Sequence, residues 1–415
     1  MRARGLISLF FAALALAGRA DYGACTHVTR RQTFPLRDKV FPLMRSAGMT
    51  WARCDFDWFT MKPRPADDWK FDAFDQVIAS AERNGIQLLP ILCGVPGWAK
   101  PPLEHRDEFG DYVRAFAKRY AKRFPVIEIW NEPNLNMFWP GASPDTYFLM
   151  LKTAADAIRS EAPGVKVAIS GFSDVPLKFI ERLYQLGAKD YFDIMNVHPY
   201  TNPLPPEGIL DRRLEQLHAL MVKHGDGKKP VWITELGWPT QPVLRPNESH
   251  FPPVTEAEQA ELLARAMGIC FAEGVQNFFW YEFYAPERKE DDPESYFGLV
   301  HKDTSPKPAY DAYHHFTQVR PTGSKAVPGL WRQGKWYFPQ WKRPDGKPAG
   351  MIWRIPKGGG STLDKGVRFV GRPSFTDHLG KPVKVKSKNG VYEIPAQTAP
   401  LFFTGATIDL KGMIK

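Results

Sequence analysis

Short apolar, β-branched segments alternate with amphipathic helical segments from about residue 23 to residue 321, and this repetition constrains the fold more than any other feature. We expect strands at Gly23–Val28, Thr50–Asp55, Ile86–Cys93, Val126–Trp130, Val165–Ser170, Phe192–Val197, Val231–Thr234 and Val275–Tyr281. We expect helices at Asp38–Ala47, Phe71–Asn84, Phe109–Phe124, Pro144–Ala162, Leu177–Leu186, Leu210–His224, Glu256–Glu273 and Ala309–Val319. The strands are apolar on both faces, as parallel strands covered by helices must be. Eight strands, each followed by a helix, predict a (β/α)₈ TIM barrel over residues 21–320.

Two glutamates stand at the ends of expected strands. Glu132 follows the fourth strand in Trp130-Asn131-Glu132-Pro133-Asn134, and Glu235 follows the seventh in Thr234-Glu235-Leu236-Gly237-Trp238. Active sites of TIM barrels lie at the C-terminal ends of the strands, and strands four and seven face each other across the barrel. Glycoside hydrolysis needs two carboxyl groups, one to protonate the leaving oxygen and one to attack or to activate water. A single strand-end glutamate is as well explained by a surface salt bridge, but the pair indicates a glycosidase.

The segment around Glu132 resembles the Asn-Glu-Pro signature of the retaining (β/α)₈ glycosidases of glycoside hydrolase clan A. The spacing to the Thr-Glu-Leu-Gly-Trp segment of Glu235 fits the same clan, and the resemblance covers about residues 23–320, with families 39 and 5 nearest. It implies that Glu132 is the acid/base and Glu235 the nucleophile. It also implies that Asn131 hydrogen-bonds the 2-hydroxyl of the sugar.

Further residues are similar to those of the clan at corresponding strand ends. Arg53 resembles the arginine of the second strand, where a guanidinium would lower the pKa of the nucleophile and keep it ionised. An ion pair of Arg53 with Asp55 or Asp57 is the alternative. His198 and Tyr200 resemble the pair after strand six, with Tyr200 expected to hydrogen-bond the nucleophile and His198 to line the sugar site.

Aromatic residues at the strand ends are candidates for stacking on sugar rings. Trp280, at the end of strand eight, resembles the sugar-platform tryptophan of the clan. For Trp98, Trp139 and Trp238, stacking in flanking subsites and packing in the core both remain open. Glu282, which departs from the commonest pattern after the platform tryptophan, could contact substrate hydroxyls or pair with a lysine.

Beyond Pro321 the helical periodicity ends. Short alternating segments broken by Gly and Pro predict a small all-β sandwich over residues 328–410, with hairpin turns at Asp377–Lys381 and Lys388–Gly390. Arg320–Lys415 contains 18 Lys or Arg and 5 Asp or Glu, against 55 and 45 in the whole chain, so the basic excess belongs to this module. The module either binds an anionic polysaccharide or envelope surface by charge, or packs on the barrel and stabilises it. Packing is the interpretation favoured here.

Residues 1–20 have the layout of a secretory signal. Two arginines precede the apolar run Leu6–Leu16, small residues follow, and cleavage is expected after Ala17 or Ala20. The run is too short for a bilayer span and no later stretch reaches 18 apolar residues, so no transmembrane anchor is expected. Cys25 lacks the preceding apolar residue of a lipoprotein signal, which argues against lipid anchoring. The sequence predicts a secreted or periplasmic protein.

The expected activity is that of an exported retaining β-glycosidase acting on a poly- or oligosaccharide, anionic ones included. No cofactor or metal is expected, because the four cysteines lack metal-like spacing. Nucleic acid is not an expected partner, because the chain has no Arg-rich helix, zinc spacing or RNA-binding sequence. Two alternatives stay open: a non-catalytic carbohydrate-binding protein on a degenerate barrel, and a transglycosylase that uses the same residues. The identity of the sugar and the choice between endo and exo action also stay open.

Overall fold

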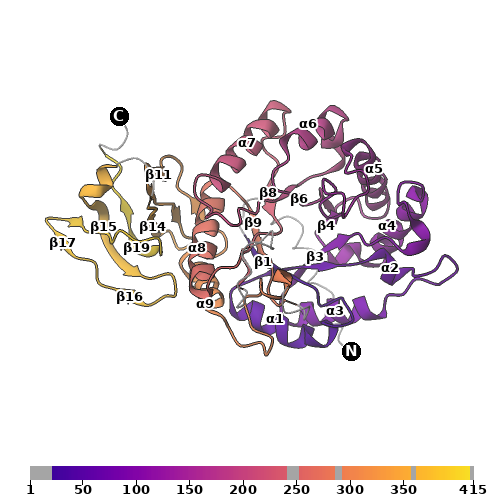
Figure 1. Cartoon of the computed structure of the whole chain (residues 1–415), viewed down its shortest axis with the longest axis horizontal. Helices are drawn as coiled ribbons and strands as arrows, with labels where there is room; N and C mark the ends of the chain where they lie inside the picture. The colour runs from indigo at the N-terminus through magenta and orange to yellow at the C-terminus, as the bar shows by residue number, and fades with distance from the viewer. Residues whose placement is uncertain (1–20, 241–251, 286–291, 357–360, 412–415) are drawn as a thin grey trace, which may run out of the picture.

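The computed structural model describes residues 21–240, 252–285, 292–356 and 361–411. Its larger part is a barrel of parallel strands surrounded by helices, and its smaller part is an antiparallel module on one side of the barrel (Figure 1). The expected signal segment, residues 1–20, lies outside the described residues. Within the described ranges, no helix is long and apolar enough to cross a membrane.

The barrel strands pair in parallel in the order β5-β4-β3-β2-β1-β9-β8-β7-β6. Their bounds are β1 Asp21–Thr26, β2 Trp51–Asp55, β3 Gln87–Leu92, β4 Val126–Ile129, β5 Lys166–Ala168, β6 Phe172–Ser173, β7 Met195–His198, β8 Val231–Ile233 and β9 Asn277–Trp280. β5 pairs with β4, β6 pairs with β7, and only 3 residues separate β5 from β6, so they are two halves of the fifth barrel strand. Bridges from Ala168 to Ile194 and from Asn131 to Gly171 close the sheet across this break. The prediction of a (β/α)₈ barrel is confirmed.

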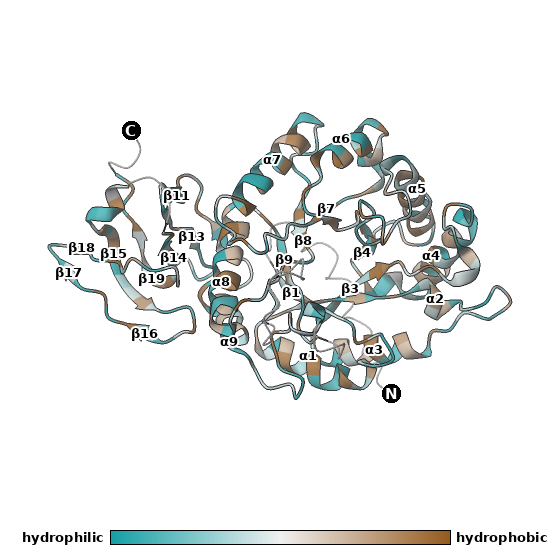
Figure 2. Ribbon diagram, viewed as in Figure 1, coloured by the Kyte–Doolittle hydropathy of each residue, from teal (hydrophilic) through white to brown (hydrophobic). Residues whose placement is uncertain are grey.

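The helices lie on the outside of the barrel and turn their apolar faces toward the strands (Figure 2). They are α1 Arg37–Ser46, α2 Trp58–Met61, α3 Asp72–Arg83, α4 Arg106–Tyr120, α5 Pro144–Glu161, α6 Leu177–Gln185, α7 Leu210–Lys223, α8 Glu256–Ala272 and α9 Pro308–Val319. Of these, only the single turn α2 had no counterpart among the expected helices. Their starts follow local chemistry: Pro144 opens α5, and Thr255 and Glu258 form a reciprocal capping box at α8.

The interior of the barrel has an apolar lower level and a polar upper level. The lower level is one buried cluster of inward-facing side chains: Trp51, Leu89, Val126, Ala168, Ile194, Trp232 and Phe279. Gly23 of β1 leaves room for it, because a Cβ there would lie 2.5 Å from the Phe279 ring. Strand side chains alternate, so the next inward positions come two residues later along each strand. Those positions are mostly polar: Cys25, Arg53, Glu128, Ser170, Asn196 and Thr234.

The C-terminal module is an antiparallel sheet with the strand order β10-β13-β14-β19-β15-β18-β17, and with β11, β12 and β16 paired at its sides. Its strands are β10 Lys325–Ala326, β11 Arg332–Gln333, β12 Trp336–Tyr337, β13 Gln340–Lys342, β14 Pro348–Arg354, β15 Val367–Thr376, β16 Pro382–Val383, β17 Ser387–Lys388, β18 Val391–Tyr392 and β19 Leu401–Ile408. The expected hairpin turns are both present, between β15 and β16 and between β17 and β18. Asn389 and Gly390 form the second turn with φ of 53° and 74°, the two positive values that a tight two-residue turn requires.

The module and the barrel share one hydrophobic core. Alternation along β14 sends Ala349, Met351 and Trp353 into the core of the barrel and Ile352 into the module's own core. Gly268 of α8 permits the contact, because a Cβ there would lie 2.7 Å from the Met351 sulfur. The central strands of the module are therefore covered on both faces.

Two indole groups fix the module in place. Trp341 donates to the carbonyl of Val319 at 3.1 Å, and Trp353 donates to the buried Glu207 carboxylate at 2.7 Å. The packing role favoured from the sequence is therefore the one that the structure displays.

Candidate active site

Arg53 organises the polar upper level of the barrel. Its guanidinium donates to Glu128 at 2.7 and 2.9 Å, to Glu235 at 2.5 Å and to the side-chain oxygen of Asn131 at 2.9 Å. The Arg53 side chain is only 5 % exposed. One cation therefore ties together β2, β4 and the chain that follows β8.

Glu128 is a functional residue that the sequence interpretation missed. It is fully buried in β4, holds Arg53 through both oxygens, and also accepts from the backbone N–H of Gly171 at 3.1 Å. A signal was available: Glu128 is a lone charged residue at an inward position of an apolar strand, and a buried charge needs a partner.

The alternative ion pairs of Arg53 are not the ones formed. Asp55 instead contacts His27 at 2.7 Å and Arg30 at 3.1 Å, and these two partners hold the pKa of Asp55 below its usual range despite burial. Burial and the Asp55 charge raise the pKa of Asp57 to about 7. Arg53 therefore pairs with Glu128 and Glu235 and not with Asp55 or Asp57.

The backbone that carries Glu132 is strained. Trp130 and Glu132 have φ of 73° and 42°, in the left-handed region that costs a non-glycine residue about 1–3 kcal/mol. The surroundings hold this conformation: the N–H of Glu132 donates to the Gly171 carbonyl at 3.0 Å, and the Trp130 indole donates to the Phe138 carbonyl at 3.2 Å. The turn directs the Glu132 side chain over the barrel mouth.

Glu132 lies against His198. The distance from a Glu132 oxygen to Nδ1 of His198 is 2.9 Å, and Nε2 of the same ring is 2.9 Å from the Thr234 hydroxyl. Because that hydroxyl donates to Asn196, Nε2 carries the ring proton and Nδ1 accepts. Burial lowers the pKa of His198 to about 4, so the ring is neutral near pH 7. Nδ1 can then accept only from a protonated Glu132, and burial raises the pKa of Glu132 to about 7.

Gly171 makes room for the His198 ring, which gives a first prediction. A Cβ at position 171 would lie 1.9 Å from Nε2 of His198, so Gly171→Ala must displace the ring from Thr234 and Glu132. We expect kcat/KM to fall by roughly 100-fold, since misplacing site groups by about 1 Å costs that much. Gly164→Ala is the matched control, because an added Cβ there meets nothing within 4 Å. Equal activity of the two variants would contradict the assigned role of His198.

Glu235 sits opposite Glu132 with two donors of its own. One oxygen accepts from Arg53, and the other accepts from the Tyr200 hydroxyl at 3.1 Å, as expected from the sequence. Burial raises the pKa of Glu235, and the positive charge of Arg53 opposes that rise. The two carboxyl groups thus have unequal environments, one beside a neutral ring and one beside a cation, which suits an acid and an ionised nucleophile respectively.

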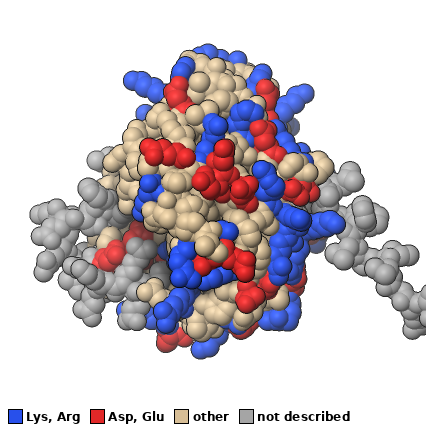
Figure 3. Space-filling model, turned by 90° about the vertical axis from the view of Figure 1, so that its right-hand side faces the viewer, with Lys and Arg blue, Asp and Glu red and all other residues tan. Residues whose placement is uncertain are grey.

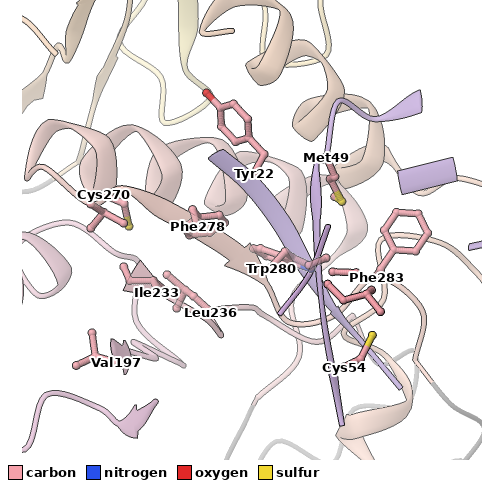
Figure 4. Close-up of a cluster of buried hydrophobic side chains, with 14 of the residues drawn as sticks. Tyr22, Met49, Cys54, Val197, Ile233, Leu236, Cys270, Phe278, Trp280 and Phe283 are labelled. Atoms are coloured by element: carbon pink, nitrogen blue, oxygen red, sulfur yellow. The ribbon is translucent and has the colours of Figure 1, made fainter. Parts of the chain in front are cut away.

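The tryptophans expected to stack on sugars lie mostly in the core. Trp280 is fully buried within the apolar cluster of Figure 4 and packs against the buried Trp238 at 6.0 Å between ring centroids. This differs from the expectation, because a ring with no exposed face cannot stack on a sugar. Trp139 is 2 % exposed and packs edge-on against Trp130. Trp98 is half-buried and donates to the Lys62 carbonyl.

Further carboxylates line one side of the mouth. Glu282 is fully buried, and one of its carboxylate oxygens lies 3.4 Å from Nε2 of His27. Glu294, from the acidic segment after β9, accepts from the Tyr281 hydroxyl at 2.6 Å, and its charge helps to raise the pKa of Glu132. The sequence interpretation did not include Glu294 among the site residues.

Glu132, His198 and Glu235 could each offer one donor atom to a cation, since one such atom of each lies within 4.8 Å of the others. The arrangement suits proton transfer better than a metal. Both nitrogens of His198 already have protein partners, and the guanidinium of Arg53 touches Glu235 where a cation would have to bind.

The separation of the Glu132 and Glu235 carboxyl groups indicates which kind of glycoside hydrolysis the site suits. Carboxyl groups that work with a covalent intermediate lie about 5–5.5 Å apart, whereas those that must admit water between them lie about 6.5–9.5 Å apart. One oxygen of Glu132 lies within 4.8 Å of one oxygen of Glu235, which is close enough for the first of these arrangements. A (β/α)₈ barrel with such a pair at the C-terminal ends of its strands has the arrangement of a retaining glycoside hydrolase.

Comparison with known proteins points to one family of that class. A solved family 39 glycoside hydrolase from Bacteroides cellulosilyticus WH2 superimposes with a TM-score of 0.76 at 22 % identity, over 94 % of this chain and 81 % of that one. A family 39 β-xylosidase from Caulobacter crescentus gives a TM-score of 0.66 at 14 % identity, over 93 % and 96 %. The fold, including the β-sandwich after the barrel, is that of family 39, and the resemblance to clan A is confirmed.

The sequence comparison agrees. A β-xylosidase from Geobacillus stearothermophilus is 26 % identical over 309 residues, which cover 68 % of this chain and 58 % of the relative. The chain therefore spans less than two thirds of that relative's length. No protein-family model matches the chain.

Proposed function

We propose that this chain is an exported retaining β-glycosidase with Glu132 as acid/base and Glu235 as nucleophile. The observation that carries the proposal is the pair of carboxyl groups within 4.8 Å of each other at the barrel mouth, one beside neutral His198 and one on Arg53. The family 39 fold supports it.

In the first step, an oxygen of Glu235 bonds to the anomeric carbon while the bond to the leaving oxygen breaks, and Glu132 gives its proton to that oxygen. In the second step, Glu132 takes a proton from water, the water oxygen bonds to the anomeric carbon, and the Glu235 carboxylate leaves. Two inversions at one carbon give net retention. Because Glu235 loses its charge in the intermediate, Glu132 ionises more readily when it must act as a base.

Arg53 and Tyr200 hold Glu235 in position, and the Glu128 carboxylate balances the charge of Arg53. Asn131, which is fixed by Arg53 and partly exposed, remains our prediction for the contact to the 2-hydroxyl.

The pH dependence follows from these assignments. The active form has Glu132 protonated, and its pKa is about 7, so kcat/KM should fall as the pH rises through about 7. In Glu132→Gln this alkaline limb should disappear, because glutamine does not titrate. Rate profiles from pH 4 to pH 9 on an aryl glycoside with a good leaving group measure both. An unchanged alkaline limb in the variant would assign the proton to another residue.

The proposed substrates are β-glycosides, with a β-xyloside first. Two relatives, from Geobacillus stearothermophilus and Caulobacter crescentus, are described as β-xylosidases. Export is supported by the signal-like residues 1–20, and the N-terminal sequence of the protein recovered outside the cytoplasm would test it.

The experiment that tests the activity is a hydrolysis screen on aryl β-xyloside, β-glucoside, β-mannoside and β-glucuronide. NMR identifies the anomer that forms first, and a slow 2-fluoro glycosyl substrate labels the nucleophile for peptide mapping. A β-anomer as first product and a label on Glu235 would support the proposal. An α-anomer as first product, a label elsewhere, or no turnover on any β-glycoside would overturn it.

A further inference from the structure

One edge of the C-terminal module carries a large excess of positive charge. We call it the cationic edge. It lies on β15 and on the chain from β16 to β17, and extends from the turn beside α9 to the end of the module far from the barrel (Figure 1). Its members are six exposed side chains: Arg368, Arg372, Lys381, Lys384, Lys386 and Lys388.

The lysines are presented in a regular row. Val383 and Val385 pack onto the module core, so Lys384, Lys386 and Lys388, which alternate with that inward face, point to solvent. Alternate residues of an extended chain are about 6.6 Å apart. Such a row suits a linear partner with charges repeated along it.

The bases of the cationic edge outnumber the acids beside them, which include Glu393 next to Lys386. No ion pair links any of the six to another described residue. Between residues 365 and 393 the only acids are Asp377 and Glu393, and Asp377 already accepts backbone N–H groups of its own turn. The end of the barrel that faces away from the module differs, because Lys or Arg and Asp or Glu are interspersed there (Figure 3).

The aromatic and apolar residues near the cationic edge argue against nucleic acid and a lipid bilayer as its partner. The aromatic rings nearest to it, Phe369, Phe375 and Tyr392, pack together in the module core and offer no platform for stacked bases. Among the residues that the structure describes, Val370 is the only large apolar side chain exposed beside it, which gives a bilayer little to anchor on. A flexible polyanion needs neither an aromatic platform nor an apolar anchor.

We propose that the cationic edge binds a polyanionic polysaccharide whose repeating units carry carboxylate or sulfate groups. This rests on the proposed function, since the barrel would act on the same polymer or on one mixed with it. The module would thus both brace the barrel and hold it on an acidic matrix.

The test measures binding without turnover, so it does not depend on finding the cleaved bond. The full-length Glu235→Gln protein is titrated with polygalacturonate, heparin, neutral xylan, duplex DNA and anionic vesicles at 50 and 300 mM NaCl. Lys384→Gln/Lys386→Gln/Lys388→Gln is compared with Lys39→Gln/Lys118→Gln/Lys228→Gln, three exposed barrel lysines without an ion pair to another described residue.

We expect binding to a polyanion at low salt that weakens at high salt, with a further loss of about tenfold in the first triple variant alone. The carboxylated and sulfated polymers distinguish the two anionic groups. Three results would each overturn the proposal: equal affinity for neutral xylan, equal loss in both triple variants, or tighter binding to duplex DNA or anionic vesicles than to either polysaccharide.

Discussion

Glu235→Gln should lower kcat/KM on an aryl β-glycoside by roughly 10⁴-fold, since loss of a nucleophile from a preorganised site costs on that order. The variant keeps the shape of the side chain and its contacts to Arg53 and Tyr200, but an amide cannot form the glycosyl ester. The measurement is kcat/KM beside Glu161→Gln, an exposed glutamate on α5, which should match the wild type. Retention of more than about a hundredth of wild-type activity would remove Glu235 from the role of nucleophile.

A second variant separates loss of the nucleophile from loss of the site. In Glu235→Gly the space left by the side chain should admit azide, which bonds to the anomeric carbon as the protonated leaving group departs. Because azide enters from the face that Glu235 occupied and no second displacement follows, the product should be the α-glycosyl azide. A β-glycosyl azide would instead place the attacking group on the opposite face, with Glu132.

Glu128→Gln should lower the free energy of unfolding by about 3–5 kcal/mol, the usual cost of removing one partner from a buried ion pair. Glu128 is fully buried and meets Arg53 through two hydrogen bonds, and glutamine would leave that part of the guanidinium charge unpaired in the barrel interior. Denaturant titration of both proteins, followed by tryptophan fluorescence, measures the difference.

The surface pair of Glu82 and Arg123 is the matched control for this prediction. It has two hydrogen bonds of 2.7 and 2.5 Å, but both groups are exposed, so Glu82→Gln should cost less than about 1 kcal/mol. The double variant Arg53→Met/Glu128→Leu should be more stable than Glu128→Gln, because it leaves neither of those two charges buried. Similar losses of unfolding free energy in the Glu128 and Glu82 variants would show that burial does not determine how much the Arg53–Glu128 pair contributes to stability.

The fold could be predicted because strands and helices differ in the period of their apolar residues. Predicted and observed bounds are close, as for the helix expected at Glu256–Glu273 and found at Glu256–Ala272. The central part of the site followed from topology, since side chains at the ends of β2, β4, β7 and β8 must converge. Glu132, Glu235, Arg53, His198 and Tyr200 do so.

The rest of the site could not be predicted, because it depends on which way each side chain faces. Phe279 fills the barrel interior, so Trp280, one residue later, points outward into the helices, and a resemblance in sequence position alone does not report that alternation. Glu128 was overlooked because an apolar strand was expected to hold only apolar contacts. Glu294 and His27 reach the mouth through loop and strand-end conformations that periodicity does not encode.

The shared core described above has a consequence for how this chain can change over evolutionary time. A module joined by a linker alone can be lost, duplicated or exchanged between proteins, because each part keeps its own interior. Here Trp353 and Met351 belong to the hydrophobic core that the barrel helices form, and Gly268 has no side chain where Met351 packs. We therefore expect the barrel and the module to be inherited together. We expect new specificity to arise on surfaces away from the interface between them, such as the loops at the barrel mouth and the cationic edge.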